Sequence, residues 1–270
     1  MKKYIGAAVL ACLISSCASD DSSIISSNEK GNMQLYFDAT MHGDQLLINT
    51  STFPSKNNET IKISKFNYII SNIRLKDDQG NEFIYPKNES YFIINTEANQ
   101  QTIQLANIPQ GNYTSITFGL GVDAQKYLTG EENQQEFWDY AATQDMTWSW
   151  ITGYKFINLE GEFTSATVTT PTTFNLHIGS HGTALDNYKE VTLTLPNTAR
   201  VRTTNTPSIH FLVDAMQLLD GANEVKLEHH LNPAGTSASI MVNAEWSPKI
   251  MSNATEMFTV DHVHNGGEGH

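Results

Sequence analysis

The sequence predicts an all-β fold, a single antiparallel β-sandwich domain with short helical connections. Of the 270 residues, 39% are hydrophobic and only 17% are charged, while Thr, Asn and Ser are abundant, which does not suit a coiled coil or a helical bundle. Apolar and polar residues alternate in many short segments, the pattern of half-buried strands. Gly, Pro and Asn separate these segments, as in a sandwich of short strands joined by turns.

The alternation begins at residues 33–39, which read Met-Gln-Leu-Tyr-Phe-Asp-Ala. The stretch 77–81, Asp-Asp-Gln-Gly-Asn, is a turn that makes a hairpin of the segments on either side of it. Pro109 and Gly111 fix a second tight turn. Further strands are expected at 61–63, 66–70, 73–75, 83–85, 91–94, 102–105, 113–120, 154–159, 174–178, 190–195 and 209–213. Helical periodicity is confined to 131–142 and 214–219.

The N-terminal segment has the composition of a secretory signal peptide. Two lysines follow Met1, and residues 5–14 are mostly apolar but too few to span a membrane. The run ends in Leu13-Ile14-Ser15-Ser16-Cys17, which resembles the box at which a bacterial lipoprotein is cleaved and its cysteine lipidated. An ordinary signal peptide with a chance cysteine is the alternative. We expect a lipoprotein signal peptide over 1–16, a flexible tether over 17–32 from lipidated Cys17, the β-sandwich domain over 33–247 and a histidine-containing tail over 248–270.

The mature protein is expected in the cell envelope as an outer-membrane lipoprotein, on the surface or the periplasmic face. Residues 18–23, Ala-Ser-Asp-Asp-Ser-Ser, resemble the acidic signal that directs some lipoproteins to the surface, although such runs are also typical of flexible tethers. A formal net charge of −13 argues against a nucleic-acid partner. Anionic lipid should also repel this acidic domain, so the N-terminal lipid provides the membrane attachment.

Tryptophans are concentrated in the middle of the expected domain. Trp138, Trp148 and Trp150 all lie between residues 137 and 154. In an extended strand Trp148 and Trp150 would point to the same side. An aromatic stripe of the core explains this spacing without any further function, since each ring buries about 150–250 Å².

Histidines are the other candidate ligands. His177 ends an expected strand, and the glycines of the following 178–182 segment argue against a helix, so His177 and His181 are not placed on one face by their spacing. His210 lies in an apolar strand, which favours a core histidine with satisfied hydrogen bonds. The remaining histidines are His42, the pair His229 and His230, and the tail residues His262, His264 and His270. Lipidation of Cys17 and removal of Cys12 leave no thiolate, so a transition-metal site would need His, Met or carboxylate ligands.

The sequence contains no pattern that indicates catalysis. It has no Gly-x-Ser-x-Gly elbow, phosphate-binding loop or dinucleotide-binding fingerprint. The acidic pairs 20–21 and 77–78 fall in the tether and in a turn, where solvation explains them. No residue is indicated as a catalytic acid, base or nucleophile, and we expect that the protein is not an enzyme.

Six short sequence segments, called phrases below, occur in the order typical of a known family. In these segments the chain resembles the MbnP-like copper-binding proteins, over roughly residues 33–215. The phrases are Phe66-Asn67-Tyr68-Ile69-Ile70-Ser71-Asn72-Ile73-Arg74-Leu75, Ile108-Pro109-Gln110-Gly111-Asn112-Tyr113, Phe118-Gly119-Leu120-Gly121-Val122-Asp123, the stretch 146–154, Leu159-Glu160-Gly161 and His177-Ile178-Gly179-Ser180. The resemblance implies a β-rich secreted or lipid-anchored domain. Its best-described members bind Cu(I) through two histidines and a tryptophan oxidised to kynurenine by a partner dihaem enzyme of the cytochrome c peroxidase type.

Two ligand positions of the family match this sequence and one does not. The resemblance implies that Trp148 is the oxidisable tryptophan and His177 the later ligand histidine. Trp150 stands where the family's copper binders have a second histidine, and indole has no lone pair that replaces that of imidazole. His181 is the nearest histidine that could take over this role.

Two hypotheses of different classes follow. In the first, the protein is a cell-envelope lipoprotein that captures or holds Cu(I) near Trp148 and His177. In the second, it is a non-metal binding or structural β-sandwich, with the region 148–154 as core or as an aromatic face for a glycan or peptide. The exposure of Trp148 and Trp150 and the position of His177 relative to them discriminate the two.

Overall fold

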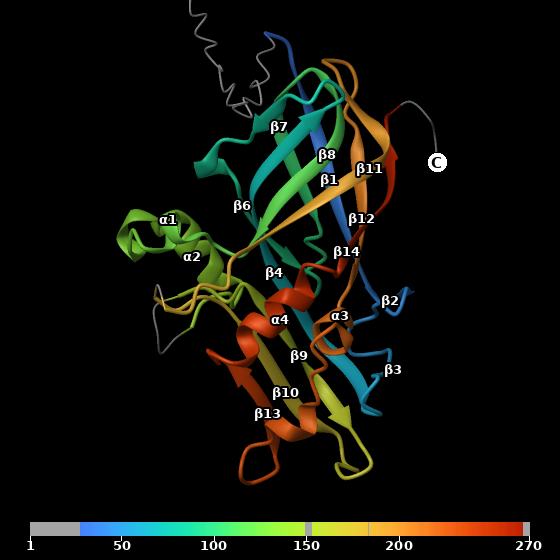
Figure 1. Ribbon diagram of the computed structural model, residues 1–270, viewed down its shortest axis with the longest axis vertical. Helices are drawn as coiled ribbons and strands as arrows, with labels where there is room; N and C mark the ends of the chain where they lie inside the picture. The colour runs from blue at the N-terminus through green and yellow to red at the C-terminus, as the bar shows by residue number, and fades with distance from the viewer. Residues whose placement is uncertain (1–27, 149–152, 183, 267–270) are drawn as a thin grey trace, which may run out of the picture.

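The computed structural model describes residues 28–148, 153–182 and 184–266 (Figure 1). The strands are β1 (Lys30–Met41), β2 (Asp44–Gln45), β3 (Phe53–Pro54), β4 (Thr60–Asp77), β5 (Glu82–Ile84), β6 (Tyr91–Asn95), β7 (Thr102–Pro109), β8 (Gly111–Leu120), β9 (Ile157–Thr164), β10 (Thr172–Ile178), β11 (Lys189–Val201), β12 (Ser208–Asp214), β13 (Ser237–Met241) and β14 (Phe258–His264). The helices are α1 (Ala124–Tyr127), α2 (Gln135–Thr143), α3 (Gln217–Asp220) and α4 (Trp246–Ala254). Short 3₁₀ turns lie at Lys87–Glu89, Glu131–Asn133 and Leu227–His230. Within these ranges no helix is long and apolar enough to cross a membrane.

Two β-sheets form the fold. In the larger sheet the strand order is β11-β8-β4-β9-β10-β13, with β3, β5 and β6 also paired to β4. The smaller sheet has the order β14-β12-β1-β2, with β7 paired to β1. Strand β4 joins the two halves of the molecule, because its first part pairs with β9 and its second part with β8 (Figure 1). Helices α1 and α2 project beside the sheets at the level where these two parts meet.

The all-β prediction is confirmed, but the expectation of purely antiparallel sheets is wrong. β1 runs parallel to β12, and β10 runs parallel to β13. A parallel pair needs a long crossover between its strands. Here the crossover from β1 to β12 contains most of the larger sheet. A local sequence pattern cannot predict a connection between strands so far apart in the chain.

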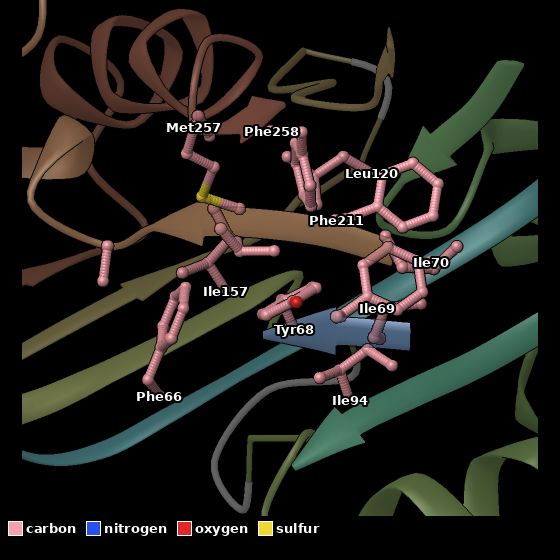
Figure 2. Packing of buried hydrophobic residues seen from close by; sticks show 14 of the residues in the cluster. Phe66, Tyr68, Ile69, Ile70, Ile94, Leu120, Ile157, Phe211, Met257 and Phe258 are labelled. Atoms are coloured by element: carbon pink, nitrogen blue, oxygen red, sulfur yellow. The ribbon is translucent and has the colours of Figure 1, made fainter. Parts of the chain in front are cut away.

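The core lies between the two sheets and follows the alternation seen in the sequence. Met33, Leu35 and Phe37 on β1 are fully buried, while the residues between them are partly exposed. The ring of Phe37 stacks on Phe211 of β12 at 4.7 Å and meets Phe118 of β8 edge-on at 6.1 Å. Figure 2 shows aromatic and aliphatic side chains from both sheets, with Met257 and Phe258, meeting in this layer.

The three segments expected at 61–63, 66–70 and 73–75 form the single strand β4. The pairing of β4 with β8 shifts register between Ser71 and Arg74, and Asn72 there has a φ of 48°. Asparagine tolerates this left-handed conformation better than most residues. The side chain of Asn72 reaches Asp123, with Nδ2 donating to Oδ2 at 2.9 Å. Two of the six phrases are thus joined directly.

The expected domain boundaries need correction at both ends. Strand β1 begins at Lys30, inside the expected tether. At the other end, β14 pairs with β12 from Phe258 to His264, and α4 begins before residue 247. Met257 and Phe258 are only 1% and 3% exposed, so much of the expected tail belongs to the core. The histidines of this segment suggested a polar tail, whereas packing against β12 decides its structure.

Candidate metal centre

Trp148 and His177 line the same hollow. It has a volume of about 290 Å³ and lies where the segment between α2 and β9 meets the ends of β10 and β13. The lining side chains are those of Ala142, Asp145, Thr147, Trp148, Lys155, His177 and Met241. Residues distant in the sequence are therefore brought together by the order of strands β9, β10 and β13.

Trp148 forms a buried wall of this hollow and is 5% exposed. The residue directly follows Thr147, which forms an antiparallel β-bridge with Tyr154. Its ring packs against the backbone of Gly179, where an added Cβ would lie 2.7 Å from Cη2 of the indole. The same Cβ would lie only 2.0 Å from the carbonyl oxygen of Tyr154, so the backbone of Tyr154 and the ring of Trp148 together require glycine at this position.

His177 is held in place by a carboxylate on the neighbouring strand. Its side chain lies on β10 and is largely buried, and Nε2 is 2.8 Å from Oε1 of Glu160 on β9. This hydrogen bond and the Lys65 ammonium group lower the pKa of Glu160 despite the cost of burial. The carboxylate is therefore ionised at neutral pH and can only accept, so Nε2 of His177 carries a hydrogen.

A balanced group of charges surrounds the histidine. Asp145 accepts hydrogen bonds from Lys155 at 2.7 Å and from Lys65 at 2.9 Å. Burial raises the pKa of Asp145, but the hydrogen bonds from Lys155 and Lys65 outweigh burial and bring it below its usual value. Lys65 also lies 3.8 Å from Glu160. Both lysines are thus engaged by carboxylates and contribute no net excess of positive charge.

The other candidate residues lie elsewhere or outside the described part of the chain. His181 is exposed, forms a bridge with Leu185 and is not among the residues that line the hollow. Trp150 and Cys17 fall outside the described residues. Across residues 28–148, 153–182 and 184–266, no group of three or more His, Cys, Asp or Glu side chains is arranged to hold a metal ion.

The histidines of β12 and β14 form a separate pair. His210 stacks on His262 with ring centroids 4.3 Å apart, and His210 is only partly buried. His210 is therefore not the core histidine that its apolar strand suggested. His262 and His264 lie on β14, and His270 is outside the described residues.

Met241 brings a sulfur atom to the lining of the hollow, and the sequence analysis did not single it out. It pairs in register with His177 through the parallel β10–β13 contact. Its own surroundings, Ser-Ile-Met-Val-Asn, contain no metal-binding motif. Only the non-local pairing of the two strands places Met241 beside His177.

The protein is a β-sandwich domain, because two sheets of mixed strand direction pack against each other. A small polar hollow lies at the end of β10. The chain belongs to the MbnP family, whose pattern matches residues 30–242. Among solved structures it is similar to MbnP from Methylosinus trichosporium, at 14% identity and a TM-score of 0.45, with 88% of this chain and 100% of that chain covered. Among curated proteins, none matches the chain. The resemblance found in the sequence is confirmed at the level of the family.

Proposed function

We propose that the protein is a cell-envelope lipoprotein that holds Cu(I) in the hollow lined by Trp148 and His177. The observation that carries this proposal is the meeting of the two side chains in one hollow, although 28 positions of sequence separate them. Trp148 is buried, which speaks against its use as an exposed aromatic face for a glycan or peptide.

The donor chemistry at His177 fits a metal ligand. Histidines that bind metals commonly donate their other ring N–H to a carboxylate, which fixes the ring and makes the free nitrogen more basic. Glu160 provides such a partner at 2.8 Å from Nε2. With the hydrogen on Nε2, the lone pair of the neutral ring is on Nδ1, and this nitrogen would bind the metal. Imidazole is a ligand that suits copper.

The charges near the hollow favour a monovalent cation with neutral ligands. The carboxylates of Asp145 and Glu160 are engaged by lysine and histidine side chains, so they are poorly available to hard cations that need several oxygen ligands. The family resemblance implies, in addition, that Trp148 is oxidised to kynurenine by a dihaem enzyme of the cytochrome c peroxidase type. This partner and the lipid anchor at Cys17 belong to the same proposal, as does a role in copper handling without catalysis.

The test is Cu(I) binding by the mature domain under anaerobic conditions, measured by competition with a chromophoric Cu(I) chelator. His177→Gln removes the imidazole but retains an N–H donor for Glu160, so it should abolish stoichiometric binding without loss of folding. His181→Gln is the matched control and should bind as the natural protein does. Equal, tight binding by the natural protein and both variants would place the metal elsewhere and contradict the proposal.

Two further measurements examine the modified site. Trp150→His restores the histidine of the family's copper binders and should raise the Cu(I) affinity by about tenfold or more, roughly 1.4 kcal/mol. Intact-mass analysis of protein from its native envelope should reveal kynurenine at Trp148 by the gain of one oxygen and the loss of one carbon. An unmodified Trp148 in natively prepared protein would refute the oxidation but not the role of His177.

A second candidate function is suggested by a hollow of about 660 Å³ beside α2. Tyr91, Phe137 and Tyr140 contribute aromatic rings, and Asn133 and Gln134 contribute amide groups. Rings and amides together suit a small polar ligand such as a glycan. Titration with soluble oligosaccharides should then produce a fluorescence change that Tyr140→Ala removes, whereas absence of any response would reject this alternative.

A further inference from the structure

The residue opposite His177 across the β10–β13 pair is Met241. Residues paired on neighbouring strands project to the same face of a sheet. Both side chains line the hollow of about 290 Å³ together with Trp148. The residues that carry a thioether and an imidazole are therefore neighbours, in a sequence that has Trp150 at the position of the second histidine of the family's copper binders.

The environment of Met241 differs from that of the other methionines in the described part of the chain. Met33, Met41, Met146, Met216, Met251 and Met257 are between 0% and 1% exposed, and all belong to the hydrophobic core. Met241 is 38% exposed at the last position of the edge strand β13. Core packing therefore accounts for six methionines but not for Met241. An unbranched side chain at this position is free to turn its sulfur toward the hollow.

The geometry points to Met241 as the second ligand of a Cu(I) site whose first ligand is His177. This inference rests on the proposed copper-holding function. It adds a second ligand residue and a preference for soft metal ions. Thioether sulfur is a soft ligand that selects Cu(I), and imidazole also suits copper. Both ligands are neutral, so the bound ion keeps its single charge beside the carboxylates of Asp145 and Glu160.

The site should discriminate among metals by softness. Cu(I) and the comparably soft Ag(I) gain from a thioether ligand, whereas Zn(II) is held mainly by thiolate, imidazole or carboxylate. The sulfur should therefore contribute to the affinity for Cu(I) and Ag(I) and add nothing for Zn(II). Among the described residues that line the hollow, no other side chain offers a sulfur donor.

Met241→Leu tests the inference, because leucine has a similar volume and lacks sulfur. The Cu(I) affinity of this variant should fall by tenfold or more, and the copper–sulfur contribution to the X-ray absorption spectrum should vanish. Met241→His should restore the affinity, with nitrogen replacing sulfur in the spectrum. Met33→Leu, in the core of β1, is the matched control and should bind Cu(I) as the natural protein does.

A second readout does not depend on affinity. In protein labelled with ¹³C at the methionine methyl groups, Ag(I) should shift the Met241 resonance and leave that of Met33 in place, while Zn(II) should shift neither. Unchanged Cu(I) binding by Met241→Leu, with no copper–sulfur signal in the natural protein, would overturn the assignment of Met241 and leave His177 as a ligand. Absence of Cu(I) binding by the natural protein would overturn the proposed function itself, and the assignment with it.

Discussion

Asp123 provides the sharpest stability prediction, because several strong hydrogen bonds converge on one nearly buried carboxylate. Its oxygens accept from Lys87 Nζ at 2.8 Å, Tyr91 OH at 2.6 Å and Asn72 Nδ2 at 2.9 Å. Burial raises the pKa of Asp123, but the hydrogen bonds from Lys87, Tyr91 and Asn72 outweigh burial and lower it from 3.8 to about 2. The side chain is only 12% exposed, so solvent screening is limited.

The sign and size of the effect follow from linkage. Since the folded-state pKa is lower than the unfolded one, the ionised carboxylate stabilises the fold above the unfolded pKa, and this contribution is lost as the pH falls toward 2. A shift of nearly two units corresponds to roughly 2 kcal/mol at neutral pH. About half of this contribution should remain at pH near 3.

Asp123→Asn removes the charge with little change of shape. At pH 7 the variant should unfold with a free energy roughly 2 kcal/mol lower than that of the natural protein, measured by urea titration with tryptophan fluorescence. The difference should persist to about pH 5 and then shrink. Asp44→Asn, at an exposed position on β2, is the control. A difference that is the same at pH 7 and pH 3 would refute the assignment of this stability to the charged carboxylate.

Three other changes test the packing and the anchor. Gly179→Ala should destabilise the fold by about 1–3 kcal/mol and alter tryptophan fluorescence, because its Cβ would lie 2.0 Å from the Tyr154 carbonyl oxygen and 2.7 Å from the Trp148 ring. Gly111→Ala, with the nearest atom at 3.5 Å, should be close to neutral, and equal effects of the two substitutions would contradict the packing argument. Phe37→Ala should cost about 3–5 kcal/mol in urea unfolding, since the ring is fully buried; a loss below 1 kcal/mol would show that the inter-sheet core is not tightly packed there. Cys17→Ala should release the protein from membranes on fractionation, and continued membrane association would reject the lipid anchor.

The alternation of apolar residues could be read directly because each strand face has one environment. In β1 the buried positions Met33, Leu35 and Phe37 are those of the sequence pattern. The same reasoning failed for the segment after residue 247, where histidines and glycines obscured a strand that is stabilised by pairing with β12. The local sequence pattern also could not predict whether paired strands run parallel or antiparallel, since both arrangements can bury the same alternating side chains.

The sequence alone was sufficient to recognise the family. Its family-like segments also identified Trp148 and His177 as candidate site residues. It did not determine that both line one hollow, that Glu160 fixes the imidazole, or that His181 lies elsewhere. These facts depend on the order of strands β9, β10 and β13 within the larger sheet. Met241 is the clearest case: 63 intervening residues separate it from His177, and only the parallel pairing of two strands, stabilised by hydrogen bonds between backbones that carry no sequence signal, makes the two side chains neighbours.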